Sequence, residues 1–148
     1  MRMPRKFEEY ANSGTIIKVS PNRPRAEFLI EESRNSLEGL KERVEQMGIN
    51  GKNANSIVKD CYDLMMELVR ARLILDGYNS SGLYAHEAEV SYLTELNFSS
   101  NEVAFLNEVR FFRNSVTYYG KILDEEYAEE VFRFMNNLLP RLYSLFKI

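Results

Sequence analysis

The chain has 148 residues, of which 45% are hydrophobic and 12% are aromatic. That composition is enough to fill the core of one domain without help from disulfides or metals. Cys61 is the only cysteine and His86 the only histidine, which excludes an intrachain disulfide and a zinc site built from these residue types.

The apolar runs are short, and the basic N-terminus lacks the apolar stretch and cleavage site of a secretory signal. We therefore expect a cytoplasmic protein that is neither exported nor membrane-spanning. The net charge of −3 is unevenly distributed, because residues 1–25 carry about +4 and the remainder about −7. This balance argues against a broad basic face for nucleic acid, so any such contact is expected to be local.

Residues 1–25 are predicted to form an irregular N-terminal arm. They show no helical periodicity and contain three of the four prolines, with one short β-prone run at residues 15–19. We expect this basic arm to become ordered only on contact.

From residue 26 onward, apolar residues recur at alternating steps of three and four, as on one face of a helix. Asn55 is predicted to cap the second helix and Ser99 or Ser100 the fourth, and the last helix is expected to start near Asp124. The first, third and fourth predicted helices run over residues 27–47, 83–96 and 100–119. The apolar stripe of the second covers residues 57–75, and the last helix starts near residue 124 and carries its stripe to residue 145. We expect an all-α, up-and-down bundle of about five helices over residues 26–148.

The fourth predicted helix carries the best candidates for function. Arg110, Arg113 and Asn114 share one face of that helix because they are spaced by three and four residues. Arg113 adjoins apolar Phe112, so its guanidinium is not fully hydrated and needs an acceptor. That acceptor is either a carboxylate from a neighbouring helix or a phosphate from a ligand.

Tyr118 follows one turn after Asn114 on the same polar edge, where its phenol is placed to contact a ligand. Tyr119 is expected in the core. A lone histidine such as His86 is more often a structural or surface group than a catalytic one, and Cys61 falls on an apolar stripe typical of a core residue.

The segment Arg113-Asn114-Ser115-Val116-Thr117-Tyr118-Tyr119-Gly120 resembles the HEPN superfamily, and the resemblance extends over residues 26–148. These small helical bundles occur mostly in archaea and bacteria, often beside minimal nucleotidyltransferases. Their motif is an Arg, commonly followed by Asn, and a His four to six residues after the Arg. Arg113 and Asn114 match the first half, but Tyr118 stands where the His most often falls.

In active HEPN members, the Arg and His meet across a homodimer in metal-independent RNA cleavage, and the Arg holds phosphate. A phenol does not titrate near neutral pH as an imidazole does. The resemblance therefore implies a homodimer that binds a nucleotide, RNA or another phosphate ligand, or a small nucleotidyltransferase partner, without the usual ribonuclease chemistry. The expected ligand-binding residues are Arg110, Arg113, Asn114 and Tyr118, with no metal and no cofactor.

Two alternatives remain open at this point. In the first, the protein is an RNA-cleaving toxin of a toxin–antitoxin pair, with Arg113 and Tyr118 as catalytic candidates and Tyr118 or His86 in place of the missing histidine. In the second, it is a structural adaptor in which Arg113 forms an ion pair within one subunit and the basic arm docks on an acidic partner.

Overall fold

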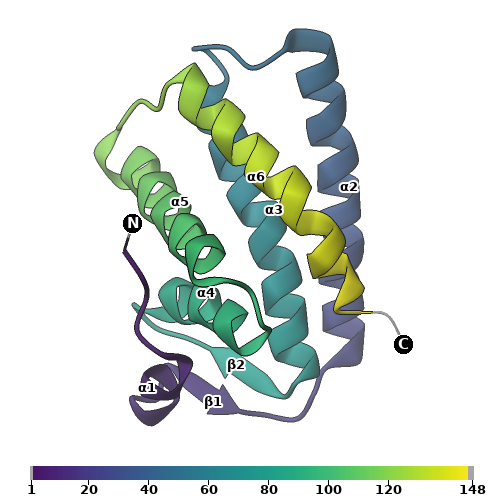
Figure 1. The fold of residues 1–148 in the computed structure, drawn as a ribbon. Coiled ribbons are helices and arrows are strands. Elements are labelled where there is room, and N and C mark those ends of the chain that lie inside the picture. Colours follow the sequence, from purple (N-terminus) through teal and green to yellow (C-terminus); the bar gives the residue numbers. More distant parts are fainter. Residues whose placement is uncertain (1, 147–148) are drawn as a thin grey trace.

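The computed structural model describes residues 2–146 and confirms an all-α bundle (Figure 1). Its elements are α1 (Phe7–Asn12), β1 (Ile16–Lys18), α2 (Arg23–Met47), α3 (Ala54–Leu75), β2 (Tyr78–Ser80), α4 (Ala85–Glu95), α5 (Ser100–Tyr119) and α6 (Glu125–Ser144). Helices α2 and α3 run antiparallel, α6 crosses them, and α4 and α5 lie on another side of α3 (Figure 1). Within the described residues, no helix is long and apolar enough to span a membrane.

Helix α3 forms the centre of the bundle, since it contacts α2, α4, α5 and α6. Most of its side chains from Ile57 to Ile74 are buried in the core. The exceptions include Asp63, Glu67 and Arg70, which are only partly buried. Their spacing of four and three places these charged groups along one edge of the helix.

Both ends of α5 and the start of α6 lie where the sequence predicts them. The Ser99 hydroxyl accepts a hydrogen bond from the Glu102 N–H at 3.2 Å, and the Glu102 carboxylate accepts one from the Ser99 N–H at 2.9 Å. Gly120 ends α5 at φ 66°, a left-handed conformation that favours glycine. Asp124 caps α6 by accepting a hydrogen bond from the Tyr127 N–H at 2.8 Å.

The prediction that Asn55 caps the second helix is wrong, because Asn53 occupies the N-cap position and Asn55 lies inside α3. The Asn55 side chain instead accepts a hydrogen bond from the Leu123 N–H at 2.7 Å and donates one to the Lys121 carbonyl at 3.3 Å. It therefore fixes the loop between α5 and α6.

The prediction of an irregular N-terminal arm is also wrong, because this segment contains α1 and β1. Phe7, Tyr10 and Ile16 are buried in the main core. The predicted β-prone run is confirmed in part, since β1 pairs antiparallel with β2, with Ile17 opposite Asn79. A six-residue helix is too short to show a periodic pattern, and its stability comes from tertiary packing.

Two prolines of the arm mark the start of α2 rather than an irregular segment. Asn22 caps this helix by accepting a hydrogen bond from the Arg25 N–H at 3.1 Å, and a proline follows in the first turn. Proline is tolerated there because the first-turn N–H groups have no helical partner. The helix therefore begins at Arg23, a few residues earlier than predicted.

We predict that Phe7→Ala destabilises the whole domain, because the Phe7 ring is 8% exposed and lies 4.8 Å from the ring of Tyr92. The expected loss in the free energy of unfolding is about 3–5 kcal/mol, measured by urea denaturation. Phe28, on the exposed side of α2 and 62% exposed, supplies the matched control Phe28→Ala. Equal losses in the two variants would show that the N-terminal segment is not part of the core.

Candidate functional site

A pocket of about 280 Å³ lies where α3, α4 and α5 meet. It contains Arg113 and Asn114, the two residues that match the first half of the HEPN motif, and it also contains His86 from α4. Its lining consists of Tyr62, Asp63, Met66, Glu67, Arg70, His86, Arg113 and Asn114. The fold thus joins the motif to the only histidine of the chain.

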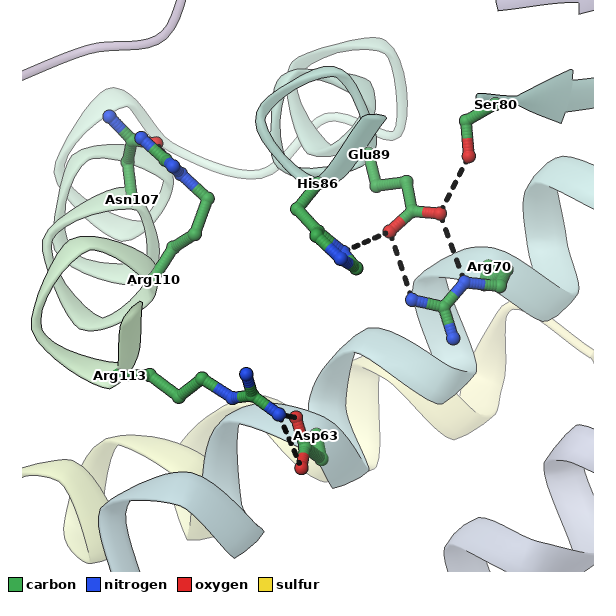
Figure 2. Close-up of polar contacts among 8 residues, drawn as sticks. All are labelled: Asp63, Arg70, Ser80, His86, Glu89, Asn107, Arg110 and Arg113. Carbon is green, nitrogen blue, oxygen red and sulfur yellow. Dashed lines mark hydrogen bonds and ion pairs between the residues drawn. The ribbon is translucent and has the colours of Figure 1, made fainter. Parts of the chain in front are cut away.

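Arg113 reaches from α5 to Asp63 on α3 (Figure 2). One terminal nitrogen of its guanidinium lies 3.3 Å and 3.4 Å from the two carboxylate oxygens of Asp63. The Arg113 side chain is 27% exposed, and its buried Nε has no hydrogen-bond partner among residues 2–146. The intrachain carboxylate therefore satisfies only part of this guanidinium.

A buried carboxylate, Glu89, organises the side of the pocket formed by α3 and α4 (Figure 2). It accepts two hydrogen bonds from Arg70, at 2.9 Å and 3.0 Å, and one from the Ser80 hydroxyl at 2.7 Å. The Nδ1 atom of His86 lies 3.4 Å from the same carboxylate. Glu89 therefore fixes the positions of both Arg70 and His86.

The pKa of Glu89 reflects this arrangement. Burial would raise it, but the hydrogen bonds from His86, Arg70 and Ser80 outweigh burial and hold the pKa at about 2. Glu89 is thus a fixed negative charge that largely neutralises Arg70.

Three buried polar atoms have no hydrogen-bond partner in the described part of the chain, and all three belong to residues that line this pocket. They are the Tyr62 hydroxyl, Glu67 Oε2 and Arg113 Nε. Burial, then the charges of Glu32 and Asp63, raises the pKa of Glu67. Burial and, after it, the charge of Glu89 raise the pKa of Tyr62. An unpaired buried polar group costs about 1–3 kcal/mol, so three such atoms in residues that line one pocket make it the candidate ligand site.

Arg110 lies in a second hollow, of about 580 Å³, rather than beside Arg113. Its Nε donates a hydrogen bond to the Asn107 side chain at 2.9 Å, and the Asn107 amide donates one to the Arg2 carbonyl at 3.0 Å. The lining is Arg2, Met3, Arg5, Tyr84, Glu87, Asn107, Glu108, Arg110 and Phe111. The expectation that Arg110, Arg113 and Asn114 act together is therefore modified, because they line two hollows on successive turns of α5.

Tyr118 and Tyr119 are both on the surface, at 73% and 84% exposed. The prediction that Tyr119 belongs to the core is wrong, because residues 117–120 at the end of α5 are all exposed. Tyr118 lines neither of the two hollows. The core position predicted for Cys61 is confirmed, and burial raises the pKa of its thiol to about 12.

Sequence reasoning did not identify Tyr62, Glu67, Arg70 or Glu89 as part of a site. One signal was available, because three charged residues follow one edge of the otherwise apolar α3. Glu89 gave no such signal, since nothing in the sequence pairs it with Arg70. No group of three or more metal-ligating side chains was found within residues 2–146.

Comparison with known proteins does not extend this description. No family model, no curated protein and no solved structure matches the chain. The HEPN resemblance therefore stays a prediction from the motif.

We predict that Glu89→Gln destabilises the protein at neutral pH by about 3 kcal/mol, because it leaves Arg70 without its buried counter-charge. The pKa of Glu89 is lower in the folded than in the unfolded protein, so its ionised carboxylate stabilises the fold. This contribution is complete above about pH 4.5 and disappears as the pH falls toward 2. Urea denaturation between pH 7 and 2 should show the gap between wild type and variant closing over that range.

Glu27→Gln is the matched control, because Glu27 forms an exposed ion pair with Arg23 on α2. Its effect on stability should be small at every pH. A gap between wild type and Glu89→Gln that stays constant from pH 7 to 2 would contradict the assignment of Glu89 as an ionised, stabilising group.

Proposed function

We propose that the protein binds a nucleotide in the pocket between α3, α4 and α5. One observation carries the proposal: the unpaired Tyr62 hydroxyl, Glu67 Oε2 and Arg113 Nε all belong to residues that line the pocket that also holds Asn114. A bound polar ligand would satisfy these groups, which the protein leaves without partners.

The charges indicate how such a ligand lies. Within the pocket, Arg70 is neutralised by Glu89, Arg113 is partly neutralised by Asp63, and Glu67 adds a further acidic group. This pocket has no excess of positive charge and suits a polar ring better than a phosphate. The neighbouring hollow contributes three arginines against two glutamates, and the terminal nitrogens of Arg110 make no hydrogen bond among the described residues.

A nucleotide matches this pair of hollows. Its base occupies the smaller pocket, and its phosphate extends toward Arg110, one turn away along α5, which is about 5.4 Å. Arginine is well suited to phosphate because its planar donors match the phosphate oxygens. The resemblance of Arg113 and Asn114 to the HEPN motif supports a nucleotide ligand. The family places phosphate on the motif arginine, whereas the charges of the two hollows favour Arg110 for the phosphate here.

A homodimer is part of the proposal. Phe111, Tyr118 and Ile122 are exposed along the end of α5 and the residue stretch that follows it. The spacing of seven between Phe111 and Tyr118 places both on one side of the helix. A second copy is the proposed partner for this surface, as in the HEPN family. A small nucleotidyltransferase is the alternative, and sedimentation equilibrium of the isolated chain separates the two because only self-association gives a dimer.

RNA cleavage is a second candidate function, favoured by the position of His86 in the same pocket as Arg113. The imidazole is placed to act as a general acid or base, with Glu89 orienting its Nδ1. Tyr118, which lines neither hollow, is less well placed for this role. Cleavage of transfer or messenger RNA that disappears in both Arg113→Ala and His86→Ala would establish the enzyme. No cleavage by the wild type would exclude it.

We predict that Arg113→Ala weakens nucleotide binding about tenfold or more, because it removes a charge-assisted hydrogen-bond donor from the pocket. Isothermal titration calorimetry with guanosine and adenosine monophosphates measures this change. Arg133→Ala is the control, since it removes the same charge from an exposed position on α6. Equal affinities of wild type and Arg113→Ala would contradict the proposal.

Asp63→Asn tests the adaptor alternative, in which the Arg113–Asp63 contact is purely structural. If Arg113 serves the ligand, removing its competing carboxylate leaves nucleotide affinity unchanged or higher. If the contact is only a structural ion pair, Arg113→Ala and Asp63→Asn lose similar amounts of stability and neither affects ligand binding.

A further inference from the structure

Glu67 is the least satisfied charged residue of the pocket. It lies on α3 between Asp63 and Arg70, and its buried Oε2 accepts no hydrogen bond within residues 2–146. Both oxygens of a carboxylate are hydrogen-bond acceptors, so a ligand with two N–H groups matches their number. Burial of an acceptor without a donor is unfavourable, and a ligand with two parallel N–H groups would remove that cost.

The charged groups around Glu67 come from every helix of the site. Glu32 on α2 and Asp63 on α3 disfavour its ionised form, while Arg70 favours it. Arg70, however, already donates two hydrogen bonds to Glu89. His86 from α4 and Arg113 from α5 complete the surroundings in the pocket. The cation nearest Glu67 along α3 is therefore engaged elsewhere, which leaves its carboxylate for the ligand.

We propose that this pocket selects guanine, with the Glu67 carboxylate accepting hydrogen bonds from the ring N1–H and the 2-amino group, and Arg113 Nε donating to the 6-carbonyl oxygen. This inference rests on the proposed nucleotide-binding function. It assigns the specificity to Glu67 and makes Arg113 the partner for the adjacent acceptor on the same edge of the base.

The hydrogen-bonding edges of the four bases support this choice. Guanine presents two N–H donors side by side, next to a carbonyl acceptor. Adenine and cytosine place a ring-nitrogen acceptor beside their amino group, and that lone pair would face a carboxylate oxygen. Uracil offers a single N–H donor. A guanidinium ligand also carries two parallel donors, but it has no acceptor for the Arg113 Nε–H group, whereas guanine presents its 6-carbonyl oxygen.

The size of the pocket fits one base. Its volume of about 280 Å³ is just below the range of about 300–1,000 Å³ typical of small-molecule sites. One fused ring system can occupy it, with the apolar Met66 side chain among its lining, while the ribose and phosphate lie outside.

Calorimetric titrations with guanosine, inosine and adenosine monophosphates test the inference. Wild type is expected to bind guanosine monophosphate at least about fivefold more tightly than adenosine monophosphate, as for a good bidentate contact. Inosine monophosphate, which lacks the 2-amino group, should fall between them. Glu67→Gln should abolish the preference, because an amide has only one acceptor oxygen. Glu32→Gln is the control, since Glu32 acts on Glu67 through its charge but does not line the pocket.

The pH dependence of nucleotide binding gives an independent test. Two N–H donors favour the ionised carboxylate and lower the raised pKa of Glu67, so binding releases a proton and tightens as the pH rises through that pKa. A phosphate beside Glu67 would have the opposite effect and take up a proton. Titrations in buffers of different ionisation enthalpy measure which occurs, and Glu67→Gln should remove the proton release.

Several results would overturn the inference: equal affinity for guanosine and adenosine monophosphates, an unchanged preference in Glu67→Gln, tighter binding of free arginine than of guanosine monophosphate, or proton uptake on binding. Nucleotide binding that depends on Arg113 but shows no base preference would refute only the role of Glu67 and leave the proposed function standing. The absence of binding by all three nucleotides would refute both this inference and the proposed function.

Discussion

The burial of α3 is the constraint on which the rest of the structure depends. This helix packs against four others, so every polar side chain along its inner turns must find a partner inside the protein. Arg70 meets this requirement through Glu89, which also contacts Ser80 and His86. The same requirement is not met at Tyr62 and Glu67. On this one helix, Arg70 has its hydrogen-bond partners and belongs to the structural framework, whereas Tyr62 and Glu67 lack partners and belong to the candidate site.

This contrast also changes the meaning of the motif on α5. The sequence places Arg113 and Arg110 on one face, but the fold gives them different partners: Asp63 for Arg113 and Asn107 for Arg110. The two arginines therefore lie in separate hollows, with the more acidic one around Arg113. A base in one hollow and a phosphate in the other is the arrangement that best fits these charges, and it makes a homodimer unnecessary for forming the pocket itself.

The helices and most of their ends could be predicted because periodicity and capping are local properties. Ser99, Gly120 and Asp124 act as the sequence indicates. The short α1 could not be predicted, since six residues give no periodic signal and Phe7 is held by distant rings. The pocket could not be predicted either, because its walls come from three separate helices. The motif identifies Arg113 and Asn114 in the sequence, whereas the position of His86 in the pocket depends on the packing of α4 against α3.

If a ligand completes the unpaired groups of this pocket, as we propose, Arg113 Nε reports its binding directly. The decisive measurement is a nitrogen-15 NMR spectrum of the arginine Nε–H groups during titration with guanosine monophosphate, with the Arg113 signal assigned by its loss in Arg113→Lys. If a nucleotide occupies the pocket, this resonance shifts as the nucleotide saturates the protein, while that of exposed Arg133 does not. An Arg113 resonance that stays unchanged at saturation would contradict the account.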